Sequence, residues 1–188
     1  MKIEEGKIKG LFFIQLEPRE DERGFFMRVY DKKIFAEHGI DKEWVQENHS
    51  LSRIKGTLRG LHFQYPPDTE SKLMRVTSGE AFWACVDLRK NSSTFGKIDH
   101  TILSAEKKNM VLIPKGCGNG ICTLADDVNL HYRVDNYYSP NNEDNIKWND
   151  PDLNIPWPIK EPSVISERDS KAQSFKEFLE KSGGGLDL

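Results

Sequence analysis

Short apolar segments recur through about the first 140 positions of the chain, and turn residues separate them. Residues 11–16, with the sequence LFFIQL, are apolar and aromatic, which suits the pleated and half-buried surface of a strand. Segments of this kind spaced 8–12 residues apart, with almost no helical pattern among them, predict an all-β sandwich or barrel. The expected strands cover residues 11–16, 25–30, 44–51, 57–64, 72–77, 81–88, 97–103, 110–113, 120–124 and 128–136.

Three stretches outside the expected strands read differently. Residues 17–24 are charged and predict a turn, whereas residues 31–39 predict a short amphipathic helix that Gly39 ends. Residues 137–161 are rich in Asn, Asp and Pro, and a long irregular stretch is unusual in a compact domain unless it has a role. Trp148 and Trp157 indicate that this stretch is ordered and wraps the domain.

The C-terminal region has a helical pattern. Ser170 is followed three residues later by Gln173, which is the spacing of a capping box. We therefore expect one helix over residues 170–182, with its aromatic side packed on the β-structure, and a frayed end at residues 183–188. The apolar residues at helical spacing are Phe175, Phe178 and Leu179.

Length and charge exclude several classes of protein. The 188 residues suit one domain over 1–188, and the 27 basic and 30 acidic residues give a net charge of −3 without a basic block, so we expect no nucleic-acid partner. No apolar run is long enough to span a membrane, and the first ten residues, MKIEEGKIKG, are too charged for a signal peptide. We expect a cytoplasmic protein without a membrane partner.

The cysteines and the common motifs offer little chemistry. Cys85, Cys117 and Cys122 are an odd number without CxxC spacing, and we expect reduced, structural thiols. There is no GxGxxG, GxxxxGK[ST], GxSxG or HExxH motif. A metal-binding β-barrel needs two histidines two positions apart on one strand, but the chain reads His62-Phe63-Gln64, so we expect no metal.

One expected strand carries polar residues among apolar ones, in the sequence TLRGLHFQ at residues 57–64. Regular alternation would place Arg59 with Leu61 on one face of the strand, and His62 with Leu58 and Gly60 on the other. A glycine here lets another backbone or a ligand approach closely. A single histidine in a strand is more often structural than catalytic.

Three further clusters have both an ordinary and a functional interpretation. Lys72 begins a strand, where an exposed lysine is common. His131 and Tyr132 are neighbours on one strand, so only one of them can face a barrel interior. Asp169 lies in the sequence SERD before the C-terminal helix, where a solvated turn is the usual interpretation.

Taken in order, these clusters resemble one known family, the dTDP-4-dehydrorhamnose 3,5-epimerases. The resemblance runs from about Gly10 to Asp169 without large gaps, and eight short motifs in the right order make it strong. They are DERGFF at 21–26, QEN at 46–48, RGLHFQ at 59–64, KL at 72–73, VDLR at 86–89, IPKG at 113–116, WNDP at 148–151 and SERD at 166–169.

The resemblance implies a metal-free and cofactor-free jelly roll of the cupin type that assembles as a homodimer. It also implies a nucleotide-diphospho-4-keto-6-deoxyhexose as substrate. The implied reaction belongs to dTDP-rhamnose biosynthesis and inverts C3 and C5 of dTDP-4-dehydro-6-deoxy-D-glucose to give dTDP-4-dehydro-L-rhamnose.

The same resemblance assigns four catalytic roles. A ketone at C4 acidifies the C–H bonds at C3 and C5, so a base can remove either proton. His62 suits the base because histidine titrates near neutrality, and Asp169 would hold its ring. Lys72 would meet the negative charge that develops on the C4 oxygen. Tyr132 would be the acid on the opposite face, which requires that Tyr132 and not His131 points inward.

Substrate-binding positions follow from the resemblance as well. Arginine side chains suit the diphosphate because their planar donors match phosphate oxygens. The implied diphosphate ligands are Arg23, Arg59 and Arg168, and the further substrate-contacting positions are Gln46, Asn48 and Glu143.

Three residues depart from the family pattern. Arg28 stands where many relatives carry Glu, Asn119 where they carry a substrate-contacting His, and Trp83 where they carry Asp. Arg28 and Asn119 nevertheless occupy substrate-binding positions. The departures leave open a single-site epimerase acting at C3 or C5 of a related dTDP-, CDP- or GDP-4-keto sugar. A metal-dependent cupin enzyme and a nucleotide-sugar binding module without catalysis are the alternatives from other classes.

Overall fold

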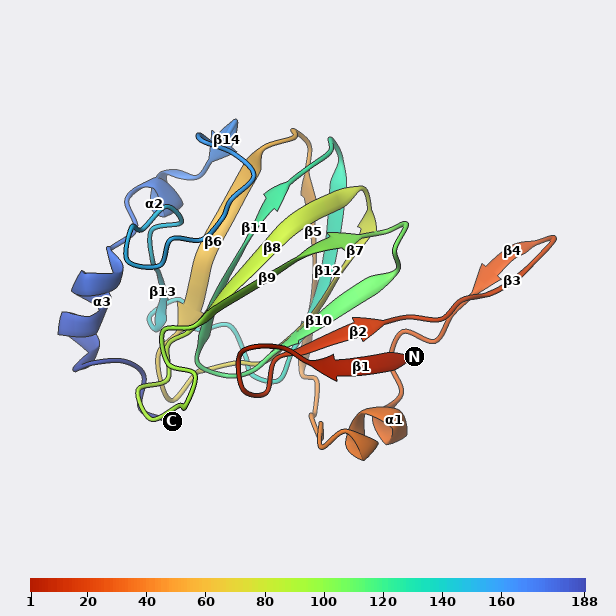
Figure 1. Ribbon diagram of the computed structural model, residues 1–188, viewed down its shortest axis with the longest axis horizontal. Coiled ribbons are helices and arrows are strands. Elements are labelled where there is room, and N and C mark those ends of the chain that lie inside the picture. Colours follow the sequence, from red (N-terminus) through yellow and green to blue (C-terminus); the bar gives the residue numbers. More distant parts are fainter.

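Two β-sheets face each other in the computed structural model, which describes residues 1–188 (Figure 1). The first sheet has the strand order β1-β2-β10-β7-β12-β5, and the second has the order β13-β6-β11-β8-β9, with β14 added beside β6. All neighbours are antiparallel except β14 and β6. The predicted all-β sandwich is confirmed.

The strand bounds match most of the expected segments. The first sheet contains β1 (Lys2–Glu5), β2 (Phe12–Gln15), β10 (Asn109–Ile113), β7 (Lys72–Ser78), β12 (Val128–Val134) and β5 (Gln46–Ser52). The second contains β13 (Glu143–Asn145), β6 (Thr57–Gln64), β11 (Cys117–Thr123), β8 (Glu80–Asp87), β9 (Ile98–Ser104) and β14 (Val164–Ile165). The sequence did not predict β1, β13 or β14, because strands of only two to four residues are too short to show an alternating pattern.

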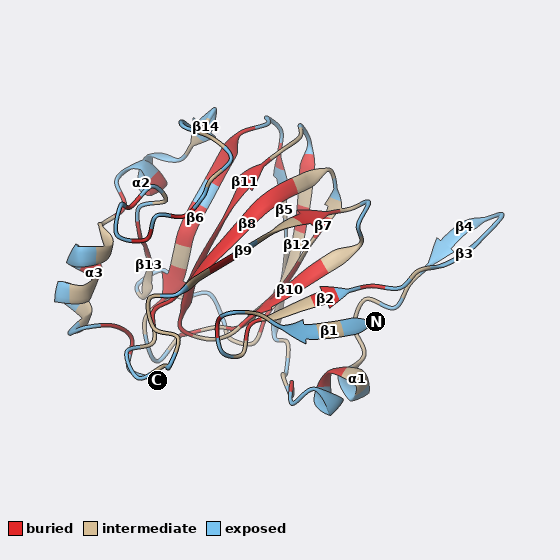
Figure 2. Cartoon of the chain, in the orientation of Figure 1, coloured by how far each residue is buried: buried red, intermediate tan, exposed pale blue.

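Side chains from both sheets fill the space between them, where Figure 2 shows the buried segments concentrated. Strand β8 illustrates the alternation: Ala81, Trp83 and Cys85 join the cluster between the sheets, whereas the residues between them face the other way. Trp83 is fully buried and meets the Phe13 ring edge-on, at 6.3 Å between centroids. All three cysteines are buried and free, as expected of structural thiols.

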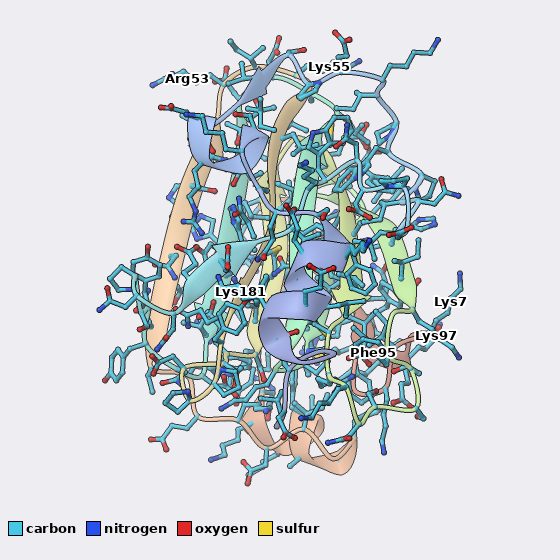
Figure 3. All side chains as sticks on the ribbon, turned by 90° about the vertical axis from the view of Figure 1, so that its left-hand side faces the viewer. Lys7, Arg53, Lys55, Phe95, Lys97 and Lys181 are labelled. Carbon is cyan, nitrogen blue, oxygen red and sulfur yellow. The ribbon has the colours of Figure 1, made fainter.

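Helix α3 (Phe175–Ser182) packs on the outer face of the second sheet, and Figure 3 shows it in front of that sheet. The buried Phe178 ring lies 5.2 Å from the Phe63 ring, which confirms the predicted aromatic contact. The predicted start of the helix is wrong. Ser174 is the N-cap and forms the capping box with Glu177, because the backbone of Gln173 is already paired beside Ile146.

The C-terminal end is ordered, so the fraying predicted for residues 183–188 is wrong. Leu186 is buried in the cluster on the outer face of the second sheet. Its N–H donates to the Leu88 carbonyl at 2.7 Å, and its carbonyl accepts from the Lys90 N–H at 3.0 Å. A buried apolar side chain flanked by two backbone hydrogen bonds fixes this segment in place.

A two-stranded hairpin projects away from the two sheets (Figure 1). It consists of β3 (Arg19–Asp21) and β4 (Gly24–Phe26), so residues 17–24 contain a strand as well as the predicted turn. The strand predicted at 25–30 ends at Phe26. The Phe25 and Phe26 side chains are more than half exposed, although the Lys108 Nζ lies 5.2 Å from the centroid of the Phe25 ring.

The remaining short segments agree with the sequence. Helix α1 (Lys32–Glu37) is capped by Asp31 and ends before Gly39. Within residues 137–161, the Trp157 indole Nε1 donates to the Trp148 carbonyl at 2.6 Å, and its ring packs on Phe82 of β8. This irregular segment is therefore ordered against the second sheet. No helix in the structure is both long enough and apolar enough to cross a membrane.

Candidate active site

Two short strands pair with opposite ends of the outer edge of β6, and the part of the edge between them has no strand partner. β14 pairs with Thr57 and Leu58 at one end, and β13 pairs with His62 to Gln64 at the other. Helix α2 (Glu167–Ser170) approaches the open part, and the Asp169 carboxylate accepts the Gly60 N–H at 3.3 Å. Ser166 caps this helix and accepts the Asp169 N–H at 3.0 Å, which fixes the direction of the carboxylate.

A β-bulge in β6 corrects the predicted alternation. Asn119 of β11 lies opposite His62 and Ile121 lies opposite Arg59, so three steps along β6 match two steps along β11. Arg59 and His62 therefore share the inner face with Ile121. Leu61 lies on the outer face, in the cluster beneath α3, and the sequence pattern had wrongly paired it with Arg59.

Gly60 is required at this bulge for two reasons. Its φ of +113° lies in a region that favours glycine. A Cβ here would lie 2.6 Å from both the Asn119 carbonyl oxygen and the Gly120 Cα. The sequence allowed either another backbone or a ligand to approach Gly60, and the approaching group is the backbone of β11.

His62 and Asp169 form the central contact of the site, with 2.7 Å between Nε2 and Oδ1. The Asp169 side chain is only 4% exposed, whereas the His62 side chain is 29% exposed. Burial alone would raise the pKa of Asp169, but hydrogen bonds from His62, Gly60 and Asn145 outweigh it and hold that pKa below its ordinary value. Asp169 is therefore a carboxylate, and the solvated turn expected of an isolated SERD sequence is not what forms.

Asn119 supports the backbone on the other side of His62. Its side chain is buried, and Nδ2 donates to the His62 carbonyl at 3.3 Å. The ring of His62 is thus held through Asp169, while its backbone is held by β11 and β13.

Tyr132 and Lys72 lie together on the first sheet. Tyr132 packs against the cluster between the sheets, whereas the neighbouring His131 ring stacks on His49 on the opposite face. The Lys72 Nζ lies 5.7 Å from the centroid of the Tyr132 ring. Burial raises the pKa of the Tyr132 phenol, Lys72 opposes this rise, and Glu70 and Glu143 add to it. The phenol is therefore protonated over a wide pH range.

Polar side chains from β5 and β6 flank Tyr132. Asn48 lies directly opposite Tyr132 in the β5–β12 pairing. Gln46, two positions away on the same face, donates from Nε2 to the Asn48 Oδ1 at 3.0 Å. Arg59 donates from Nε to the Ser52 Oγ at 3.2 Å.

Glu143 of β13 connects two further groups. It accepts from Arg168 Nη1 at 2.5 Å and from the Tyr138 hydroxyl at 2.7 Å. Burial would raise the pKa of Glu143, but these two hydrogen bonds and the nearby His62 bring it below its ordinary value. The site thus combines a carboxylate-bound imidazole with a protonated phenol, a lysine and two arginines, a set suited to proton transfer on an anionic substrate.

Comparison with known proteins decides the family. The family model described as dTDP-4-dehydrorhamnose 3,5-epimerase matches residues 5–177. The chain belongs to this family. A protein of that name from Shigella flexneri is 46% identical over 156 residues, which cover 82% of this chain and 85% of the relative. Members are isomerases, and this chain is a carbohydrate epimerase of the cupin-type jelly-roll fold.

Two solved structures show how closely the fold agrees. A dTDP-6-deoxy-D-glucose-3,5-epimerase from Legionella pneumophila, in complex with dTDP-4-keto-L-rhamnose, has a TM-score of 0.91 at 36% identity, covering 100% of this chain and 98% of that one. A 3'-monoepimerase from Streptomyces bikiniensis, in complex with dTDP-quinovose, has a TM-score of 0.87 at 29% identity, covering 96% and 90%.

Not every residue that family resemblance assigned to the site lies there. Arg23 is on the projecting hairpin, with its side chain 85% exposed and paired only with Asp21. Arg28 follows the hairpin and pairs with Asp31 at 3.2 Å. Neither arginine is brought to His62 within one chain. Trp83, a departure from the family pattern, belongs to the core between the sheets.

Two residues that the sequence did not indicate contact the predicted ones. Asn145 donates from Nδ2 to the Asp169 Oδ1 at 3.1 Å, and Glu70 forms an ion pair with Lys72 at 2.9 Å. Asn145 lies in an Asn-rich irregular stretch, where no pattern distinguished it. Glu70 lies two positions before Lys72, and this spacing was the available signal. No group of three or more His, Cys, Asp or Glu side chains is arranged to hold a metal ion.

Proposed function

We propose that this epimerase inverts C3 and C5 of dTDP-4-dehydro-6-deoxy-D-glucose and forms dTDP-4-dehydro-L-rhamnose. The observation that carries the proposal is the 2.7 Å contact between His62 and Asp169, on the inner face of the second sheet, opposite a first sheet that bears Tyr132 and Lys72. This arrangement supports removal of a proton from one face of the sugar by one group and delivery of another proton to the opposite face by a second group. The family to which the chain belongs supports the choice of substrate.

His62 takes the proton in this mechanism. Its Nε2 is hydrogen-bonded to Asp169, which leaves Nδ1 free to accept the proton from C3 or C5. The carboxylate stabilises the imidazolium that forms, as the aspartate does in hydrolase triads. The electron pair of the broken C–H bond moves onto the C4 oxygen and gives an enolate.

Lys72 and Tyr132 act on the enolate. The Lys72 ammonium stabilises the negative charge on the C4 oxygen. The Tyr132 phenol then donates its proton to the carbon from the face opposite His62. The imidazolium of His62 then loses its proton to solvent and the Tyr132 phenolate takes one up from solvent, which resets the site, and the sequence repeats at the second carbon.

Arg59 and Arg168 bind the diphosphate in this proposal, and Gln46, Asn48, Asn119 and Glu143 line the sugar and nucleotide. Arg23 and Arg28 reach a site only if a second copy of the chain supplies them. The exposed aromatic side chains of the β3–β4 hairpin support a homodimer in which each hairpin lies against the partner's barrel.

Epimerisation at a single carbon is the second candidate. It is favoured by the likeness to the Streptomyces bikiniensis 3'-monoepimerase and by Asn119, which stands where the family resemblance implies a substrate-contacting histidine. The nucleotide in that case is dTDP, CDP or GDP.

The decisive experiment is incubation with dTDP-4-keto-6-deoxyglucose in heavy water, followed by mass spectrometry and NMR of the sugar. Two deuteriums in a product of L configuration establish the 3,5-epimerase, and one deuterium identifies a single-site epimerase and its carbon. His62→Ala is expected to abolish exchange at both carbons and to leave nucleotide binding intact. Absence of exchange with dTDP-, CDP- and GDP-linked 4-keto sugars would refute the function.

A further inference from the structure

Glu70 lies two residues before β7, in a connection whose backbone is held on both sides of it. The next residue, Ser71, is fully buried and donates its N–H to Asp135 Oδ1 at 2.6 Å. The preceding residue, Thr69, is buried as well, and its carbonyl accepts from Asn136 at 3.3 Å. The Glu70 carboxylate therefore projects from a fixed point.

The partner of that carboxylate is the Lys72 ammonium. Glu70 Oε1 lies 2.9 Å from Lys72 Nζ, and the two side chains are only 10% and 13% exposed. Lys72 is the first residue of β7 and Glu70 lies two positions before it, so the two side chains meet at the end of the strand. Lysine is a point charge on a flexible four-carbon stem, and a nearly buried ion pair removes most of that freedom.

The pair lies beside Tyr132, at 5.7 Å between Lys72 Nζ and the centroid of the ring. Four charged groups from three directions influence the Tyr132 phenol: Lys72 of β7 with the preceding Glu70, Glu143 of β13 and Arg59 of β6. The cations favour the phenolate, and the two carboxylates favour the phenol. Without Glu70, only Glu143 would oppose the two cations, and the phenolate form of Tyr132 would be less disfavoured.

We propose that Glu70 is a positioning residue for the reaction, which fixes the Lys72 ammonium beside the C4 oxygen and places a compensating negative charge next to it. The inference rests on the proposed function, because Lys72 and Tyr132 take their roles from it. Glu70 itself touches no reacting atom. It acts through the placement of Lys72 and through its field at Tyr132.

The test compares Glu70→Gln and Glu70→Asp with the parent enzyme. Glu70→Gln keeps the size of the side chain and removes the charge. We expect kcat to fall about tenfold to a hundredfold with KM little changed, as for residues that orient catalytic groups. The matched control is Glu180→Gln, which makes the same change on the exposed surface of α3 and should leave kcat at the parent value.

A second measurement follows the Tyr132 phenol by NMR of protein carrying ¹³C-labelled tyrosine, with Tyr132→Phe to assign the signal. In Glu70→Gln the phenol should titrate at lower pH than in the parent, because Glu70 raises its pKa. Glu70→Asp retains the charge and should restore this titration, with kcat recovering in part.

Each outcome decides a separate point. Parental kcat and parental Tyr132 titration in Glu70→Gln would overturn the inference. A lower kcat without a change in titration, or a Glu70→Asp variant no better than Glu70→Gln, would overturn it in favour of a purely structural role. A parent enzyme that incorporates no deuterium would instead refute the proposed function, and the titration would still show whether Glu70 and Tyr132 are coupled.

Discussion

Asp169 Oδ1 lies 2.7 Å from His62 Nε2, and this oxygen also accepts the Asn145 amide at 3.1 Å. The other oxygen, Oδ2, accepts the backbone N–H of Gly60. A carboxylate surrounded by donors requires His62 to carry hydrogen on Nε2, because two acceptors cannot bond each other. The contact therefore selects the tautomer in which Nδ1 is free to accept a proton.

Asp169→Asn should lower kcat by roughly two to four orders of magnitude, as loss of the tautomer-setting carboxylate does in hydrolase triads. The amide keeps the shape of the side chain, so the fold should be retained. Deuterium exchange at C3 and C5, measured together with nucleotide affinity, checks the prediction. Parental exchange rates in this variant would refute the role of Asp169.

The matched control is Asp144→Asn. Asp144 also pairs with a basic side chain, Lys181 of α3, but on the outer side of the second sheet (Figure 3). We expect its exchange rates to equal those of the parent enzyme, because Asp144 contacts neither His62 nor Tyr132.

Tyr132→Phe should separate proton removal from inversion. His62 and Lys72 remain, so an enolate still forms and hydrogen still exchanges on the His62 face. Reprotonation from the opposite face loses its acid, which is worth about 10²–10⁴-fold. NMR should therefore show deuterium without the L-configured product. Inversion of both carbons at the parent rate would place the acid elsewhere.

Tyr65→Phe is the control for this change. The Tyr65 ring packs against Phe63 and Phe178 beneath α3, and its hydroxyl has no hydrogen-bond partner. Removal of that hydroxyl should leave inversion unchanged.

Asp87 should make the unfolding free energy depend on pH in the acidic range. Burial would raise its pKa, but Arg89, Ser92 and Thr94 donate to the carboxylate and bring the pKa below the ordinary 3.8. A lowered pKa stabilises the folded state above pH 3.8, and this contribution disappears as pH falls through the folded-state pKa. Asp87→Asn should therefore cost about 3 kcal/mol of unfolding free energy at pH 7 and less below pH 3.8.

Urea unfolding at a series of pH values measures this difference. Asp187→Asn provides the contrast, because Asp187 forms an exposed pair with Lys90 at 2.7 Å and should contribute only about 0.5 kcal/mol. A gap between the parent and Asp87→Asn that stays constant down to pH 3 would contradict the assignment.

The strands were predictable because alternation and turn residues are local signals. Strand β6 was predicted with its observed bounds. The face on which the Arg59 side chain lies was predicted wrongly, because a bulge depends on how β11 aligns with β6. The prediction of a capping box at Ser170 was wrong for a similar reason. Gln173 is held in a bridge beside Ile146, a contact between distant parts of the chain.

The site was predictable only in part. Residue pattern alone left His131 and Tyr132 equivalent, and family resemblance pointed to Tyr132, which the structure places inward. Neither pattern nor resemblance indicated Asn145 or Glu70, whose significance lies in what they contact. Conversely, Arg23 matches the family motif but lies on a hairpin directed away from the barrel of its own chain (Figure 1).

The C-terminal segment should contribute to stability, contrary to its glycine-rich sequence. Leu186 is buried against Leu88 and is flanked by backbone hydrogen bonds, so Leu186→Ala would leave a cavity. Buried leucine truncations cost about 2–5 kcal/mol, and we expect the lower part of that range because the segment is near the chain end. Urea unfolding of the variant measures the loss.

Leu188→Ala makes the same change two residues later, where the side chain is more than half exposed. It should alter the unfolding free energy by less than about 0.5 kcal/mol. Equal and small effects of the two substitutions would mean that the segment contributes nothing and that Leu186 is not held. A large effect of Leu186→Ala alone would show that the segment after α3 is held against the second sheet through Leu186.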